Sequence, residues 1–170
     1  IPIYNDIMQL SVEKIQRDCN LQPNDELICV GGTPCPNFIK SLDDPRGACL
    51  PKFLDLSISL NAKYIVLENV RGLLSAPIKH RPMSQRGKGH PPLTDEEKPG
   101  GVMKLVVAPL EQAGYKVSYQ LYDAKYFGAA TSRDRVILLA VKDDKPLPYL
   151  TPTHGVNGVP LVTLKEAFSA

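Results

Sequence analysis

Residues 27–38 read LICVGGTPCPNF, a short apolar run that ends in two glycines and a Pro-Cys-Pro turn. Because the run is brief, partly β-branched and bounded by glycine, it predicts a buried strand from Leu27 to Gly31. The glycines and prolines stop the strand and fix the backbone of the turn. Cys35 is therefore expected beyond the carboxyl end of a strand, where open α/β sheets bind their ligands. Its thiol is either a nucleophile or a small hydrophobe in a structural turn, and unpaired cysteines are more often inert.

A helix and a second strand follow this turn. Residues 50–60 carry apolar side chains at helical spacing, and Tyr64 to Leu67 is a continuous apolar run, the pattern of a strand buried on both faces. Strand, helix and strand make a βαβ unit with a right-handed crossover, so both strands end at the same edge of the sheet. Glu68 directly follows the second strand and is therefore expected near Cys35.

The other predicted elements surround this unit. Amphipathic spacing predicts helices over residues 8–19 and 103–113, the second of them stopped by a glycine. Strands are predicted at residues 115–122 and 136–141, and a short helix within 161–170. Because no helix separates the two strands, we expect them to be antiparallel. The fold class is therefore α/β, with a mostly parallel sheet that ends in an antiparallel pair of C-terminal strands.

Composition and charge exclude several classes of protein. The 170 residues suffice for one domain, and 20 basic against 18 acidic residues leave a net charge of +2, too balanced to imply nucleic acid by itself. No apolar run approaches the ~20 residues that span a bilayer. The four cysteines show no zinc-ligand spacing, so no metal is predicted. Two of them fall in a strand and a turn, which favours a reducing, intracellular compartment over disulfides.

Positive charge is concentrated in one stretch. Residues 76–93 contain no acid and six basic or histidine side chains: Lys79, His80, Arg81, Arg86, Lys88 and His90. Together with the surrounding prolines and glycines, they predict an inserted, mobile loop over about residues 76–100. The loop is either a solvated insertion or a source of phosphate contacts, which position a nucleic acid without reading its sequence.

In this order, the predicted strand ends resemble the motifs of the DNA cytosine-5 methyltransferase family. Gly31-Gly32-Thr33-Pro34-Cys35 looks like its nucleophile motif, Leu67-Glu68-Asn69-Val70-Arg71-Gly72-Leu73-Leu74 like its Glu-Asn-Val motif, and Arg133-Asp134-Arg135-Val136 like its arginine motif. Shorter matches are Asn5-Asp6-Ile7, Asp44-Pro45-Arg46-Gly47, Tyr126-Phe127-Gly128-Ala129 and Pro152-Thr153-His154. The resemblance covers nearly the whole chain outside the basic loop. It implies a partial Rossmann-like sheet of the S-adenosylmethionine-dependent methyltransferases.

The resemblance also implies a reaction, the transfer of a methyl group from S-adenosylmethionine to carbon 5 of cytosine in DNA, as in restriction-modification. Cys35 would add to carbon 6 of a base flipped out of the duplex, which splits one difficult step into two easier ones. Glu68 would donate a hydrogen bond or a proton to ring nitrogen 3. Arg133 or Arg135 would hold the ring's carbonyl oxygen and orient Glu68, with planar donors that lysine lacks.

Six further positions take roles from the same resemblance. The methyl donor would lie beside Asp6, Ile7 and Pro34. The substrate would contact Asn69, Thr131 and Arg46.

The chain also departs from the family pattern. No glycine-rich turn precedes Asp6, and no target-recognition region follows residues 151–170, which resemble the lead-in to one. Residues 1–170 are therefore interpreted as a single incomplete catalytic domain. We expect it to need missing segments or a complementing subunit before it binds the donor and methylates DNA.

Two alternatives remain open at this point. The chain could be a catalytically inactive relative that serves as a binding or scaffold module, or it could act on cytosine in RNA. The presence of Cys35, Glu68, Arg133 and Arg135 together argues against an inactive relative, because drift rarely spares all four.

Overall fold

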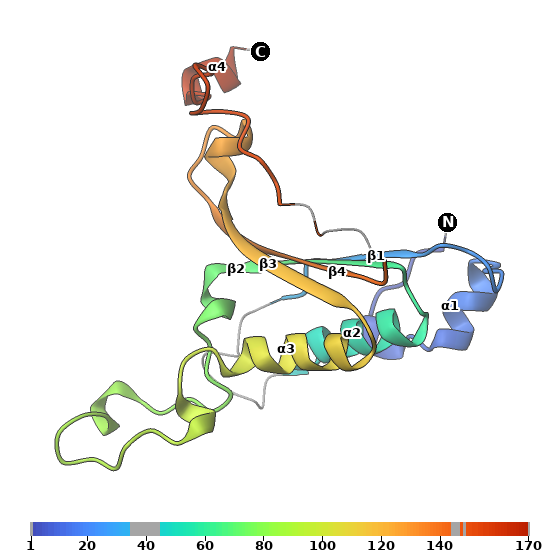
Figure 1. Cartoon of the computed structure of the whole chain (residues 1–170), viewed down its shortest axis with the longest axis horizontal. Helices are drawn as coiled ribbons and strands as arrows, with labels where there is room; N and C mark the ends of the chain where they lie inside the picture. The colour runs from blue at the N-terminus through green and yellow to red at the C-terminus, as the bar shows by residue number, and fades with distance from the viewer. Residues whose placement is uncertain (1, 35–44, 144–146, 148, 170) are drawn as a thin grey trace.

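A computed structural model describes residues 2–34, 45–143, 147 and 149–169, which form a four-stranded sheet with helices packed on one face (Figure 1). The strand order is β1-β2-β4-β3. The strands are β1 (Ile28–Gly31), β2 (Tyr64–Val70), β3 (Lys116–Asp123) and β4 (Asp134–Val141). β1 and β2 are parallel, whereas β4 is antiparallel to both β2 and β3. The βαβ unit and the antiparallel pair expected from the sequence are both confirmed, in a mixed sheet.

The described part of the chain also contains four α-helices. They are α1 (Val12–Asp18), α2 (Cys49–Ser59), α3 (Gly101–Gln112) and α4 (Leu164–Phe168). Figure 1 shows α2 and α3 side by side beneath the strands, and α4 at the end of a projection beyond β3 and β4. Short 3₁₀ turns lie at Ile7–Gln9, Pro45–Ala48, Arg71–Leu74, Met83–Gln85, Asp95–Glu97 and Ala124–Phe127. Within the described residues, no helix is long and apolar enough to cross a membrane.

The first predicted helix is shorter than its apolar pattern suggested. Residues 7–9 form a 3₁₀ turn, and α1 begins only at Val12. The cause is local, because the Ser11 hydroxyl accepts a hydrogen bond from the backbone N–H of Lys14 and so caps a new helix.

Alternate residues of β2 face opposite sides of the sheet. Ile65 and Leu67 face the helices and are completely buried, whereas Val66 and Glu68 point away from them and are half-buried. The expectation that this strand is buried on both faces was therefore wrong for the described chain, where helices cover one face. The helix-side core also contains Leu50, Leu54, Val102, Val106, Leu110, Tyr115 and Leu138.

A glycine sets how closely α2 approaches the end of β1. A Cβ atom placed on Gly31 would lie 2.7 Å from the ring of Phe53, a distance that real side chains do not tolerate. The glycine therefore allows the Phe53 ring to fill the space beneath the last residue of β1. This contact anchors the point from which the Pro-Cys turn departs.

Residues 75–100, here called the arm, leave the body between β2 and α3 (Figure 1). The base of the arm is fixed by two backbone hydrogen bonds, from Val102 N–H to Ala76 and from Lys79 N–H to Glu96. In Figure 1 the arm and the end of the β3–β4 hairpin project on opposite sides of the sheet edge where β2 ends.

Candidate active site at the carboxyl end of β2

Two predicted catalytic side chains meet at this sheet edge. Glu68 lies near the end of β2, and Arg135 near the start of β4, opposite Val70 in the antiparallel register. Because residues two apart in a strand share a face, the register places Arg135 on the same face as Glu68. Its Nε atom lies 2.5 Å from Oε1 of Glu68, with side chains 23% and 44% exposed respectively. The two side chains form an ion pair at an edge that solvent can reach.

The turn after β1 passes directly over Glu68. A Cβ atom on Gly32 would lie 3.4 Å from Oε2 of Glu68, so the backbone there runs against the carboxylate. Asn69 fastens the same turn, because its Nδ2 donates to the carbonyl oxygen of Thr33 at 3.2 Å. The chain that leads to Cys35 is thereby tied to the end of β2. Cys35 itself lies outside the described residues, so its contact with Glu68 stays a prediction.

The side chain of Asn69 lies on the helix side of the sheet and helps to hold the turn after β1. Its side chain is only 3% exposed, and its Oδ1 accepts from the N–H of Val70 at 2.9 Å. With Nδ2 on Thr33, both ends of the amide are engaged, one with the turn and the other with β2. The predicted contact between Asn69 and substrate stays a prediction.

The structure distinguishes the two arginines that the sequence left equivalent. Arg135 bonds Glu68, and its Nη1 donates to the carbonyl oxygen of Asp134 at 2.7 Å, which fixes the guanidinium plane. Arg133 is exposed, and its side chain has no hydrogen-bond or ion-pair partner among the described residues. The carboxylate of Asp134 pairs with Arg71 at 3.0 Å. Arg135 is therefore the arginine positioned to orient Glu68.

Asp123, which the sequence reading missed, organises the turn before these arginines. Its carboxylate accepts from Ser132 Oγ at 2.7 Å and from Arg133 N–H at 2.9 Å, and it pairs with Lys125 Nζ at 3.0 Å. The Ser132 hydrogen bond above all, together with Lys125, holds the pKa of Asp123 well below its usual range. Its position before a 3₁₀ turn, where aspartate caps free N–H groups, was the available signal.

The predicted donor-side residues lie on an open edge. Asp6 is exposed, and its Oδ1 accepts from Met8 N–H at 2.9 Å as the cap of the first 3₁₀ turn. Ile7 is half-buried against the core, and Pro34 is exposed. These side chains alone do not enclose a ligand the size of S-adenosylmethionine.

The remaining predicted substrate contacts are only partly visible. Thr131 is exposed on the turn that Asp123 organises. Arg46 belongs to the 3₁₀ turn Pro45–Ala48 before α2, but its side chain lies outside the description. Among the described residues, no group of three or more His, Cys, Asp or Glu side chains is placed to hold a metal ion.

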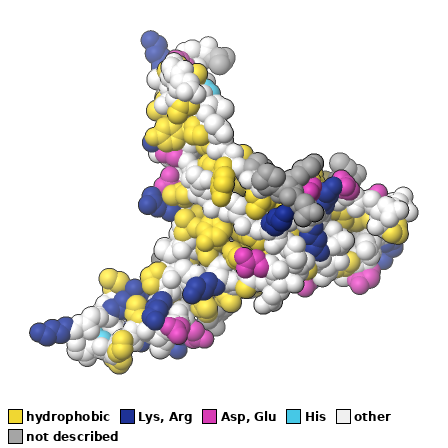
Figure 2. Space-filling view, in the orientation of Figure 1, with side chains coloured by type: hydrophobic (Ala, Val, Ile, Leu, Met, Phe, Trp, Pro, Cys, Tyr) yellow, Lys and Arg dark blue, Asp and Glu magenta, His cyan; other side chains and the backbone are white. Residues whose placement is uncertain are grey.

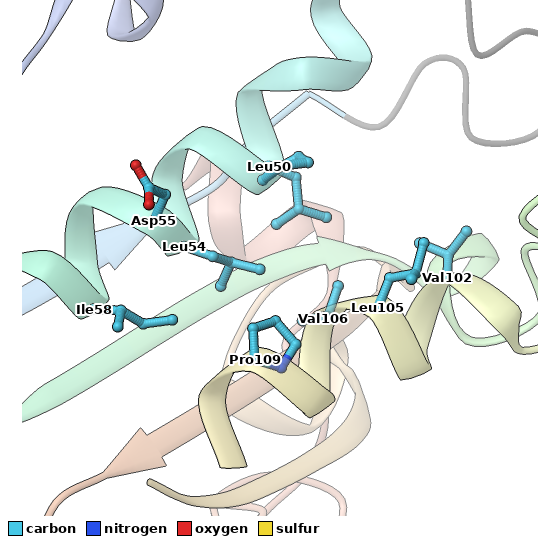
Figure 3. Close-up of a pocket in the computed structure, with 9 residues that line it drawn as sticks. Leu50, Leu54, Asp55, Ile58, Val102, Leu105, Val106 and Pro109 are labelled. Atoms are coloured by element: carbon cyan, nitrogen blue, oxygen red, sulfur yellow. The ribbon is translucent and has the colours of Figure 1, made fainter. Parts of the chain in front are cut away.

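A well-formed cavity lies elsewhere, between α2 and α3. Its volume is about 230 Å³, and Figure 3 shows Leu50, Leu54 and Ile58 of α2 facing Val106 and Pro109 of α3. A single carboxylate, that of Asp55, stands among its apolar lining residues. The cavity lacks the convergent polar groups of a substrate site and separates two helices of the core layer.

The sheet and its edge define the class of protein, a Rossmann-like methyltransferase fold. The chain superposes on a prophage-encoded protein of E. coli named for DNA modification methyltransferases, with a TM-score of 0.65 and 22% identity, over 96% of this chain and 40% of that one. It also superposes on the S. pombe Dnmt2 methyltransferase, with a TM-score of 0.56 and 18% identity, over 85% of this chain and 38% of that one.

The family follows from the sequence match. The model of the C-5 cytosine-specific DNA methylases matches residues 2–164, and the chain belongs to this family. It is 27% identical to the type II methyltransferase M.AquIA of Picosynechococcus, over 90% of this chain and 58% of that protein. It is 30% identical to M.BsuRI of Bacillus subtilis, over 91% of this chain and 32% of that protein. The chain thus spans between about a third and three fifths of the length of these two relatives.

Proposed function

We propose that the chain is the catalytic portion of an enzyme that methylates carbon 5 of cytosine in DNA, with S-adenosylmethionine as the methyl donor. The observation that carries the proposal is the Arg135–Glu68 pair, set beneath the glycine turn that leads to Cys35. Glu68 and Arg135 lie near the ends of two paired strands, and the turn toward Cys35 leaves the end of a third. Membership in the C-5 cytosine-specific family supports the same chemistry.

In the proposed reaction Cys35 acts first. Its thiolate adds to carbon 6 of the flipped cytosine, and the electron pair of the ring double bond becomes available at carbon 5. Glu68, in its carboxylic-acid form, donates a hydrogen bond or its proton at ring nitrogen 3, where charge would otherwise build up. The donor, when bound, supplies the methyl group that carbon 5 takes. Loss of the proton from carbon 5 then restores the double bond and expels the thiolate.

Arg135 has two tasks in this scheme. Its guanidinium forms an ion pair with one oxygen of Glu68, which leaves the other oxygen for the base, and its hydrogen bond to the Asp134 carbonyl keeps the guanidinium in one plane. The guanidinium has further N–H donors for the carbonyl oxygen of the pyrimidine. Donors that are already in place when charge develops are the largest source of catalysis in many enzymes.

The proposal includes a need for further segments. β1 forms one edge of the described sheet, and its Ile28 and Val30 side chains are 64% and 70% exposed. Apolar side chains on an edge strand favour pairing with additional chain. Since the relatives extend well beyond the matched part, we assign this role to the segments of the longer methyltransferases that lie outside the match.

Covalent trapping tests the proposal. Duplex DNA containing 5-fluorocytosine is mixed with S-adenosylmethionine, the chain and the complementing segments of a relative. The fluorine blocks the final proton loss, so the enzyme should remain attached to DNA. Cys35→Ser should abolish the adduct, and Glu68→Gln should slow its formation by about 100-fold or more. The chain alone should form no adduct.

Three outcomes would overturn the proposal. The first is the absence of an adduct with every segment present, which would favour a scaffold role. The second is an adduct that persists in Cys35→Ser. The third is preferential trapping of an RNA carrying the same base, which would reassign the substrate.

A further inference from the structure

The arm is internally braced by an ion pair. Arg81 donates two parallel hydrogen bonds to Glu97, from Nε to Oε1 at 2.9 Å and from Nη2 to Oε2 at 2.5 Å. The two side chains are only 14% and 8% exposed, although they lie in a segment without long helices or strands. Because removing one partner would leave a buried charge unpaired, the pair strongly favours one arrangement of the arm.

The capping turn of the arm strengthens this brace. Thr94 donates to Oε2 of Glu97 from both its N–H and its hydroxyl, at 2.9 and 3.0 Å. Arg81 also donates from Nη1 to the carbonyl oxygen of Pro91 at 2.6 Å, and thereby joins the two sides of the arm. The backbone of Thr94 and the guanidinium of Arg81 lower the pKa of Glu97 to about 2, which agrees with a carboxylate held by several donors.

The brace leaves two lysines of the arm without an ion-pair partner among the described residues. Of its three acidic residues, Glu97 is held by Arg81, and Asp95 pairs with Lys98 at 2.7 Å. The side chains of Lys79 and Lys88 are exposed and have no hydrogen-bond or ion-pair partner in the described ranges. The exposed side chains of the arm that can carry a positive charge and have no ion-pair partner among the described residues are Lys79 and His80 near its base, and Lys88 and His90 near its middle.

The arm lies beside the candidate active site. It begins at Ser75, directly after the 3₁₀ turn Arg71–Leu74 that follows β2, and so leaves from the strand that carries Glu68. Figure 1 shows it projecting from the same end of the sheet, opposite the β3–β4 projection. Figure 2 shows lysine and arginine side chains spread along its surface.

We propose that the arm binds the phosphate backbone of the DNA duplex beside the target base, with Lys79 and Lys88 as its principal contacts. This inference rests on the proposed function, since it assigns the arm to the substrate of that site. The contacts are independent of sequence, because ammonium groups and phosphates form ion pairs that carry no base information. The brace keeps the two lysines in position before DNA arrives, so less ordering entropy is lost on binding.

Salt-dependent DNA binding by the 170-residue chain tests this inference. A Lys79→Gln, Lys88→Gln double variant should bind a short mixed-sequence duplex about tenfold more weakly, and the slope of log affinity against log salt should fall by about 1.8. The matched control is Lys52→Gln with Lys104→Gln, which removes the same charge from α2 and α3. The control should change affinity less than about twofold. Equal losses in the two double variants would overturn the inference.

A second pair of variants separates the brace from simple charge. Glu96→Gln and Glu97→Gln both remove one negative charge from the arm, but only Glu97 belongs to the brace. Glu96→Gln should slightly raise DNA affinity, whereas Glu97→Gln should lower it because the lysines lose their support. A rise in DNA affinity of the same size in both variants would overturn the proposal that the brace positions the lysines.

The two proposals can fail separately. Affinity for duplex without 5-fluorocytosine reports on the arm, and the trapped adduct reports on the catalytic site. Arm-dependent binding without any adduct in the complemented enzyme would overturn the methyltransferase proposal and support the arm. If the adduct forms but DNA affinity does not depend on Lys79 and Lys88, the methyltransferase proposal is supported and the role of the arm is overturned.

Discussion

The two faces of the sheet are built from alternate residues of the same strands, yet they differ in burial and in chemistry. On the face toward α2 and α3, Ile65 and Leu67 are at most 1% exposed. On the opposite face, Val30 of β1 is 70% exposed. On that face β2, which also carries Ile65 and Leu67, contributes Glu68 to a charged pair with Arg135. One face therefore supports stability, and the other presents the charged pair and the exposed apolar side chains for which we propose catalytic and docking roles.

This division explains how a short strand serves two purposes. A shift of the register by one residue would exchange the faces, so burial of Ile65 and Leu67 also fixes the direction in which Glu68 points. The closely packed helical layer thus determines the geometry of a site that it does not touch. Substitutions on the two faces should accordingly affect different measurements.

The largest effect is expected on the helix side. Leu67→Ala removes a completely buried side chain from β2 and should lower the free energy of unfolding by about 3 kcal/mol, because the cavity closes only in part. Val30→Ala, on the exposed face, should change it by less than about 0.5 kcal/mol. Urea denaturation of the isolated chain measures both. Similar losses for the two variants would contradict the division between the faces.

The next effect concerns the charged pair. Arg135→Lys keeps the charge but loses the planar donors, and it should slow methyl transfer by the complemented enzyme about 100-fold. Arg133→Lys should slow it less than about fivefold, since its side chain has no partner in the described part of the chain. Single-turnover rates on a DNA duplex provide the comparison. A larger loss for Arg133 would show that the observed ion pair is not the catalytic arrangement.

A smaller effect is expected from the turn that supports the arginines. Asp123→Asn loses the charge that holds Ser132, Lys125 and the backbone of Arg133, so the turn before β4 should shift and methyl transfer should slow about tenfold. Asp55→Asn on α2 is the matched control and should leave the rate unchanged. If Asp123 only stabilised the fold, the rate per folded molecule would stay normal while the melting temperature fell.

The local parts of this architecture could be predicted from the sequence. The apolar runs around Cys29 and Ile65, the helix between them and the glycine stop after α3 are signals carried by neighbouring residues. They sufficed to place Glu68 at a strand end and to predict the antiparallel pair. The Ser11 cap was an equally local signal, and overlooking it made the first predicted helix too long.

The remaining features depend on pairing across the fold. Arg133 and Arg135 look alike in sequence, and only the register of β4 against β2 selects the second as the partner of Glu68. Asp123 meets groups nine and ten residues away, across a turn. Arg81 and Glu97 are sixteen residues apart in a segment without regular periodicity, so the brace of the arm left no pattern to detect.

The smallest effect on the chain itself is expected at β1, where the exposed face meets the edge of the sheet. An Ile28→Ser, Val30→Ser double variant should unfold at nearly the same urea concentration as the parent chain, because both side chains are already exposed in it. In the complemented enzyme the same positions are proposed to be covered. Each serine substitution should there remove about 1.5 kcal/mol or more of the stabilisation that comes from burying an apolar side chain. The concentration of complementing segments needed for half-maximal activity should therefore rise at least about tenfold.

Leu105→Ser, which changes an exposed apolar residue on α3, should leave that concentration unchanged. Equal behaviour of the two variants would mean that additional chain does not pack on β1, and the exposed face would then need another explanation.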